Sequence, residues 1–427
     1  MSILKVSSFL FFLQVVTILS AQVVHIPIGE KSTPDDASVK LELIARIQNY
    51  NYNVKSPFDF VNKHIDSPKS VNIFDEKNKF YIHSLEGYET LVLSLDSFKL
   101  LKVIRHSFGA SDASLFLENT ALGYSFAYKG NPNVFSGKPV ESCFTHNKRY
   151  LWVSYYRRSF DPNAIQPSAV AIIDTECDSI VRVLPTGPLP KMVAASPDGK
   201  YLAITQWGDN TIAIVDISSE NPSEFHYVKQ FVVEYKLPLN NMDNTPINRD
   251  SDCGFCLRGT VFTPDSKYLL VGRMGGGGIA FFDMDSMKYM GTMWGMKTNV
   301  RHLLIQDGYL YLSANKPGFV QKASVDTLVK MIEAGQNTYS DWKGIYVGLG
   351  ARTIDITPDG QYIFAAVNNE SKIVVVRTLD MKIVATIKAD SYPVGLAVAA
   401  DGRKIIVTSQ GRPGGGGNSV MIFSVAY

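Results

Sequence analysis

The chain has 427 residues, enough for one large β domain or for two domains of ordinary size. Hydrophobic residues make up 45% of it and charged residues 19%, which excludes an intrinsically disordered chain. The formal net charge of +2 is too small to indicate a nucleic-acid or membrane partner, so any basic surface must arise from local clustering.

The first 21 residues have the layout of a secretory signal peptide. Lys5 is their only charged residue, an apolar run extends from Phe9 to Leu19, and the small residues Ser20 and Ala21 follow. This pattern predicts export with cleavage after Ala21. The alternative is a membrane anchor, but the run is shorter than the ~20 residues that a spanning helix needs. We expect no transmembrane segment and a protein that is periplasmic, secreted or held at the cell surface.

Residues 22–66 form a mostly polar N-terminal segment with one structured element. Val39, Leu41 and Leu43 alternate with polar Lys40 and Glu42, which is the pattern of a half-buried strand. We expect a strand over about residues 39–47.

Residues 67–427 contain seven repeats of short strands separated by turns. The clearest repeat starts at Arg352, with a Pro358-Asp359-Gly360 turn between its first two strands and a polar loop at 368–371. We place the fifth repeat at 301–332 and treat 235–259 and 333–351 as insertions before inner strands. The compact spacing of about 42 residues is typical of a propeller blade. Since one open sheet of ~28 strands is far beyond usual sizes, we predict an all-β, seven-bladed β-propeller of four-stranded antiparallel blades.

The seventh repeat stops at Tyr427 after its third strand. The strand predicted at 39–47 is the natural candidate to supply the missing fourth strand, which would join both chain ends in one blade. The alternative is an incomplete last blade with the N-terminal run lying across a face of the ring.

Two segments carry a resemblance to a known family. SPDGKYLAIT with NTIAIVDI, from Ser196, and TPDGQYIFAAVNNESKIVVV, from Thr357, resemble the YVTN-type β-propeller repeat family. The resemblance covers roughly Pro68 to Tyr427 and implies a seven-bladed propeller, often exported or on a cell surface. It implies no single function, because members include binding modules and related propellers include lactonases and dehydrogenase subunits.

A basic residue recurs just before the first strand of most repeats. Alignment on the Pro-Asp-Gly turn gives seven equivalent positions, occupied by Lys69, Val140, Lys191, Arg258, Arg301, Arg352 and Val394. The five cations are predicted to form a partial ring at one mouth of the central channel, where they suit an anionic ligand. The alternative is that each basic stem packs on the next blade while its head satisfies a loop carbonyl or an acid.

Loops on the same face extend this candidate site. Its further predicted ligand-binding residues are Arg157, Trp207, Arg273, Asn368 and, beside the ring on an inner strand, His302. A lone histidine on an inner strand is also compatible with a hydrogen-bonded wall residue.

Four cysteines are present, and export permits disulfides. The spacing of Cys253 and Cys256 favours a local disulfide over a redox pair, or over a metal site that would need two more ligands. Cys143 is expected to be a buried thiol and Cys177 to lie in a turn at the opposite face, which makes a bond between them doubtful.

These features favour a non-catalytic exported propeller that binds an anionic small molecule, glycan or protein partner on its basic face. Two alternatives remain open: a lactonase-like hydrolase that uses the channel, and a scaffold subunit of a cell-envelope complex. No catalytic residue, metal site, cofactor or nucleic-acid partner is predicted.

Overall fold

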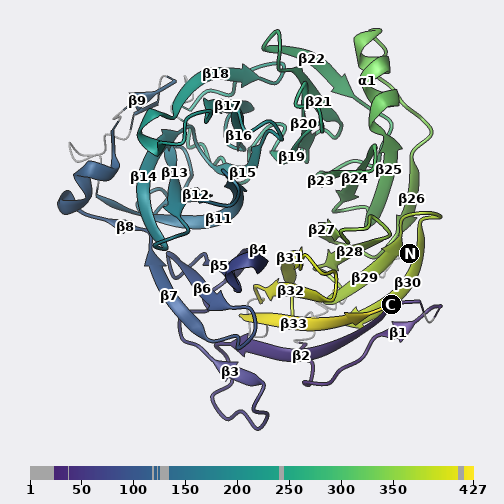
Figure 1. The fold of residues 1–427 in the computed structure, drawn as a ribbon. Helices are drawn as coiled ribbons and strands as arrows, with labels where there is room; N and C mark the ends of the chain where they lie inside the picture. The colour runs from purple at the N-terminus through teal and green to yellow at the C-terminus, as the bar shows by residue number, and fades with distance from the viewer. Residues whose placement is uncertain are drawn as a thin grey trace, which may run out of the picture.

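The computed structural model describes residues 24–36, 38–117, 120–122, 124–125, 134–239, 245–411 and 418–427. The predicted signal peptide lies outside these residues. Seven antiparallel sheets stand around a central axis as a seven-bladed β-propeller (Figure 1), which confirms the predicted fold. The first strand of each blade is innermost, and neighbouring inner strands contact one another around a closed ring.

Blades one to four follow the chain in order, from the inner strand outward. Their strands are β4 (Pro68–Phe74), β5 (Lys79–Ser84), β6 (Glu89–Ser94) and β7 (Leu100–Arg105); β11 (Phe135–Thr145), β12 (Tyr150–Arg158), β13 (Ser168–Asp174) and β14 (Ser179–Thr186); β15 (Pro190–Ala195), β16 (Tyr201–Gln206), β17 (Thr211–Asp216) and β18 (His226–Val232); and β19 (Leu257–Phe262), β20 (Tyr268–Arg273), β21 (Ile279–Asp283) and β22 (Lys288–Met293).

The remaining blades use the same order. Their strands are β23 (Val300–Gln306), β24 (Tyr309–Ala314), β25 (Phe319–Ser324) and β26 (Lys343–Tyr346); β27 (Ala351–Ile356), β28 (Tyr362–Val367), β29 (Lys372–Arg377) and β30 (Lys382–Lys388); and β31 (Pro393–Val398), β32 (Lys404–Ser409) and β33 (Ser419–Ala426). Short elements decorate the ring: β8 (Ser107–Phe108) on blade two, the hairpin β9 (Thr120–Ala121) and β10 (Tyr124–Ser125), and 3-10 turns at Asp75–Lys77, Ala110–Leu115 and Pro222–Glu224.

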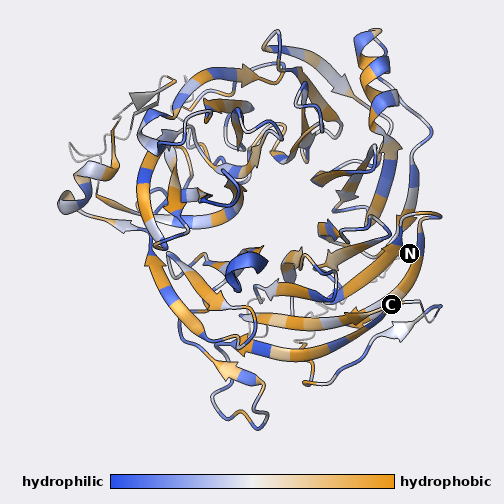
Figure 2. Ribbon diagram, in the orientation of Figure 1, coloured by the Kyte–Doolittle hydropathy of each residue, from blue (hydrophilic) through white to orange (hydrophobic). Residues whose placement is uncertain are grey.

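Local chemistry explains why each repeat folds back on itself. In blade six, Gly360 has a φ of +71°, a conformation that suits glycine, and the Asp359 carboxylate accepts a hydrogen bond from the Gln361 amide at 3.0 Å. The strand that follows, β28, is apolar along almost its whole length and buried from Ile363 to Val367. Hydrophobic residues are concentrated along the strands (Figure 2), so the core is a set of layers between neighbouring blades.

The N-terminal segment closes the ring. Strand β2 (Lys40–Gln48) pairs antiparallel with β33 and so supplies the fourth strand of blade seven, as the sequence predicts. Strand β3 (Asp59–Val61) adds to β2 in parallel, and β1 (Thr33–Pro34) pairs with β30 of blade six. The N-terminal segment therefore spans two blades (Figure 1).

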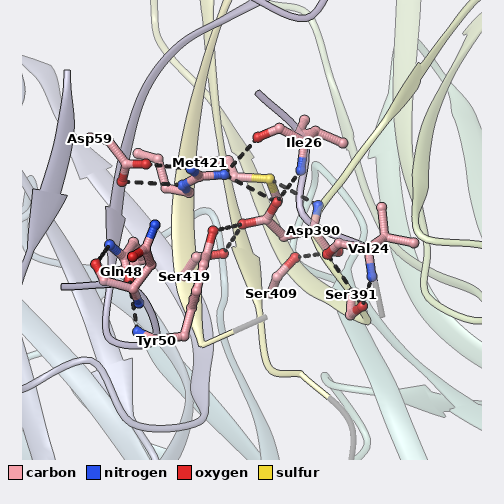
Figure 3. A network of polar contacts seen from close by, with 12 residues as sticks. Val24, Ile26, Gln48, Tyr50, Asp59, Asp390, Ser391, Ser409, Ser419 and Met421 are labelled. Atoms are coloured by element: carbon pink, nitrogen blue, oxygen red, sulfur yellow. Dashed lines mark hydrogen bonds and ion pairs between the residues drawn. The ribbon is translucent and has the colours of Figure 1, made fainter. Parts of the chain in front are cut away.

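A buried polar network holds this closure in place (Figure 3). Arg46 of β2 forms an ion pair with Asp59 and places its Nη1 3.4 Å from Asp390 Oδ1, between blades six and seven. The Asp390 side chain is fully buried, and it also accepts hydrogen bonds from the Ile26 amide at 2.9 Å and from Ser419 Oγ at 2.7 Å. One carboxylate thus connects the N-terminal segment, β2 and β33.

The fifth repeat extends beyond its predicted end at residue 332. Residues Val325–Glu333 form helix α1, capped by the Ser324 hydroxyl, which accepts from the Thr327 amide at 3.3 Å. Its buried residues Val325, Leu328 and Ile332 recur at helical spacing. The outer strand β26 comes instead from the segment predicted as an insertion at 333–351, and that part of the prediction is wrong.

Blades one and two are joined by a buried chain of hydrogen bonds. Its members run from blade two back to the channel wall in the order Tyr155, His106, Thr90, His83, Ser142 and Asn72. Because Asn72 Oδ1 can only accept, each hydroxyl or ring N–H along the chain donates toward it. Both imidazoles are therefore held neutral, each with one nitrogen donating and one accepting.

Acid is expected to destabilise the protein through this chain. Burial lowers the pKa of His83 to about 3 and that of His106 well below its usual value, while an unfolded histidine titrates near ~6.5. The unfolded chain therefore binds more protons below pH ~6.5, so the free energy of unfolding should fall as the pH drops from 6.5 toward 3.

Urea unfolding of the wild type and of His106→Gln between pH 7 and 4 measures this effect. The variant should show a shallower loss of stability with falling pH, whatever its stability at pH 7. The exposed His226→Gln should keep the wild-type slope. Equal slopes for His106→Gln and the wild type would contradict the prediction.

Candidate functional site

The structure brings the five predicted cations together. Each is the second residue of its inner strand, and all five line one cavity of about 250 Å³ at the mouth of the channel, which we call the mouth cavity. Its lining residues are Lys69, Leu85, Glu86, Val140, Tyr156, Arg157, Lys191, Arg258, Arg301, Arg352 and Gln410.

A β-bulge aims these side chains at the axis. In blade three Pro190 pairs with Gln206 and Met192 with Thr205, which leaves Lys191 as the extra residue. The inner strands of the other blades have a register shift at the same place, for example around Arg301 and around Arg352. A bulge redirects the side chain it carries. Because the bulge recurs at the same position of each inner strand, the side chains at that position form a ring around the channel.

Half of the cations in the mouth cavity are paired with acids. Arg258 forms an ion pair with Glu141 of blade two. Arg157 Nη2 lies 3.1 Å from Asp250 Oδ2, and Lys191 Nζ lies 4.0 Å from Asp250 Oδ1. Asp250 belongs to the insertion at 235–259, which therefore reaches the basic face as the sequence predicts.

Aromatic rings cover one of these cations. Lys191 Nζ lies 3.6 Å from the centroid of the Tyr156 ring and 4.9 Å from that of Trp207. The two rings partly compensate for its removal from water. Trp207 thus acts on Lys191 and does not itself line the mouth cavity.

The other three cations have no carboxylate partner among the described residues. Lys69 donates to Gln410 Oε1 at 2.7 Å, Arg301 donates to the Met274 sulfur at 3.3 Å, and the Arg352 guanidinium lies 5.8 Å from the centroid of the Tyr392 ring. We call Lys69, Arg301 and Arg352 the unpaired cations.

Burial and mutual repulsion act against these charges. Burial, then the neighbouring Arg352 and Arg258, lowers the pKa of Lys69 well below its usual value. The same causes lower the pKa of Arg301. Burial lowers the pKa of Arg352 to about 10, against an opposing effect of Tyr392. The charged forms are therefore destabilised in this environment, and a nearby negative group would stabilise them.

His302 lines a different cavity, deeper in the channel. This inner chamber has a volume of about 290 Å³ and also contains Glu141 and Asp355. Burial lowers the pKa of His302 to about 4, and its Nδ1 has no hydrogen-bond partner in the described structure. Because Arg258 lines the mouth cavity and Glu141 the inner chamber, their ion pair lies between the two.

Besides Trp207 and His302, two further predicted site residues do not line the mouth cavity. Arg273 Nη1 lies 2.5 Å from Glu234 Oε1, and its guanidinium stands 3.7 Å from the centroid of the Phe255 ring. Asn368 is 2% exposed, and its backbone N–H donates to the Gly350 carbonyl at 3.0 Å. Neither lines the mouth cavity: Arg273 contacts the segment between β18 and β19, and Asn368 lies in the loop after β28.

Two of the four cysteines form a disulfide in the segment that leads into blade four. Cys253 and Cys256 are joined by a disulfide with a Cα–Cα distance of 4.9 Å, directly before β19 and Arg258. Cys143 is a free, partly buried thiol whose pKa burial raises to about 12, and Cys177 is free and exposed.

Comparison with known proteins identifies the fold but no family. No family model matches the chain, and no curated protein matches it. Among solved structures, hydrazine synthase of Kuenenia stuttgartiensis is similar at 12% identity and a TM-score of 0.55, over 85% of this chain and 96% of that chain. The β-propeller domain of Cps50 (Swd1) from Myceliophteria thermophila is similar at 12% identity and a TM-score of 0.57, over 89% and 100%.

These likenesses extend to the fold alone, because the identities are low. The YVTN-type resemblance stays a prediction. In the part of the chain that the structure describes, no helix is both long and apolar enough to span a bilayer.

Proposed function

We propose that this protein is an exported, non-catalytic β-propeller that binds an anionic ligand in the mouth cavity. The observation that carries the proposal is the presence of the unpaired cations in one cavity. The proposal of export draws on the signal-peptide pattern of residues 1–21, and the Cys253–Cys256 disulfide is compatible with it.

A purely structural role would predict a different arrangement. A buried cation that only supports the fold is normally paired, because an isolated buried charge is costly. Arg258 and Arg157 follow that rule through Glu141 and Asp250. Of the unpaired cations, Arg352 is buried and Lys69 and Arg301 are half-buried, and none of the three follows that rule within the described structure, although the chain has almost as many acidic as basic residues. Their arrangement suits a site that an anion completes.

Binding of inorganic phosphate tests the proposal. At constant ionic strength and pH 7, phosphate should raise the melting temperature in a saturable manner, because a ligand at 100 times its Kd stabilises the folded state by about 2.7 kcal/mol. Arg301→Gln should abolish most of this rise. The matched control is Lys330→Gln, which removes an exposed cation on α1 and should leave the rise unchanged.

Two outcomes would overturn the proposal. One is the absence of stabilisation by phosphate, sulfate, acetate or glucuronate at ionic strengths where binding is not screened. The other is a rise that Arg301→Gln and Lys330→Gln reduce equally, which would place the anion elsewhere on the surface.

A further inference from the structure

We infer that the ligand of the mouth cavity is a compact anion with two or more negative charges, of the phosphate or phosphate-monoester class, bound by the unpaired cations on one half of the mouth. The inference rests on the proposed function. It adds the charge of the ligand, its size and the side of the mouth on which it lies.

The mouth has two electrostatically different halves. Arg157, Lys191 and Arg258 come from blades two, three and four, where Asp250 and Glu141 offset their charge. The unpaired cations come from β23, β27 and β4 in blades five, six and one.

The second half is contiguous. Strand β23 contacts β27, β27 contacts β31, and β31 contacts β4, so blade seven lies between the cations of blades six and one. Among the described residues, which leave out 412–417, blade seven contributes no cation to the cavity lining: Val394 occupies its ring position, and Gln410 provides a neutral side chain whose amide oxygen accepts from Lys69. Glu86 of blade one also lines the cavity, but Lys138 of blade two offsets its charge at 2.6 Å. The excess positive charge is therefore concentrated over blades five, six, seven and one.

The positive charge of the unpaired cations favours an anion with more than one negative charge. A single carboxylate carries one negative charge and two oxygens, so it would leave most of the unpaired cations uncompensated. A phosphate monoester carries about −1.5 to −2 charges at pH 7 and offers three acceptor oxygens. Two guanidinium groups and one ammonium that approach from three different strands match three such oxygens, since arginine binds phosphate in a bidentate manner and lysine acts as a point charge.

The volume of the mouth cavity limits the size of the ligand group that it can hold. About 250 Å³ corresponds to roughly eight water volumes, just below the ~300 Å³ at which pockets for drug-sized ligands begin. A phosphoryl group with its hydration or a few further atoms fits this space. The Arg258–Glu141 ion pair lies at the inner end of the cavity, so the rest of a larger ligand would extend toward solvent.

Isothermal titration calorimetry at fixed ionic strength and pH 7 tests the inference. The probes are inorganic phosphate, glucose 6-phosphate, acetate and glucuronate. The two phosphates should bind at least 10-fold more tightly than the two carboxylates. Inorganic phosphate and glucose 6-phosphate distinguish a site for the free ion from one that accepts an ester. Arg352→Gln should weaken phosphate binding at least 10-fold, and Arg157→Gln, whose cation is already paired, should weaken it less.

The possible results separate the two proposals. Equal affinities for acetate, glucuronate and phosphate would overturn the multivalent-anion inference but leave an anion site. A larger loss from Arg157→Gln than from Arg352→Gln would overturn the assignment to blades five, six, seven and one. Binding of none of the four probes would overturn the proposed function itself.

Discussion

Replacement of Asp390 by alanine is expected to lower the free energy of unfolding by about 3–5 kcal/mol, the usual cost of removing one partner of a buried ion pair. Asp390 has no exposed surface, and its carboxylate faces Arg46, the Ile26 amide and Ser419. Its loss would leave an amide and a hydroxyl without their acceptor. It would also weaken the contact between β2 and the blade that β2 completes.

Asp36→Ala is the matched control for this variant. Asp36 also ties the N-terminal segment to blade six, through an ion pair with Arg377, but that pair lies at the exposed surface. Exposed pairs contribute little to stability, so the free energy of unfolding should hardly change. Urea unfolding of both variants gives the comparison. Similar losses for Asp36→Ala and Asp390→Ala would contradict a special role for the buried carboxylate.

A second variant at the same site separates the contribution of the charges to stability from that of side-chain packing. Arg46→Met combined with Asp59→Asn and Asp390→Asn removes the charge of Arg46 and of both carboxylates that contact it, while retaining a side chain at each position. Because the cost of a broken buried pair is largely that of the orphaned charge, the triple variant should be more stable than the sum of the three single losses indicates.

The fold could be predicted from the sequence because it depends on local periodicity. Turn residues such as Gly360 and alternating or continuous apolar strands recur seven times, and a four-strand unit cannot bury its faces alone. The closing strand was accessible for a similar reason: one strand was missing at the C-terminus and one alternating run, at 39–47, was left over. Helix α1 was missed because apolar residues such as Val325, Leu328 and Ile332 were assigned by repeat length and not by their own period.

The ring of cations could be predicted from the sequence because a repeat places equivalent residues at equivalent positions. The ion-pair partners could not be predicted, because they are distant in sequence and no local pattern indicates them. Arg258 meets Glu141 across 117 positions, and Arg46 meets Asp390 across 344. The sequence also did not indicate which loop side chains enter the cavity. Arg273 pairs with Glu234, and neither Arg273 nor Asn368 lines the mouth cavity.

Replacement of Arg352 by methionine is expected to have opposite effects on stability and on binding. Arg352 is 8% exposed, and burial lowers its pKa to about 10, so its charge opposes folding in the absence of a ligand. Methionine retains much of the packing of the stem and removes the buried charge. The unliganded protein should therefore become more stable, by about 1–3 kcal/mol, while its stabilisation by phosphate should largely disappear.

Urea unfolding of the wild type and of Arg352→Met, each with and without saturating phosphate, measures both effects. Without phosphate the variant should unfold at a higher urea concentration than the wild type, and phosphate should narrow or reverse that difference. Arg258→Met is the informative comparison, because it breaks an existing ion pair with Glu141 and should destabilise the unliganded protein. If Arg352→Met also destabilises the unliganded protein, Arg352 stabilises the fold through its charge, and the ring belongs to the architecture of the blades and not to a ligand.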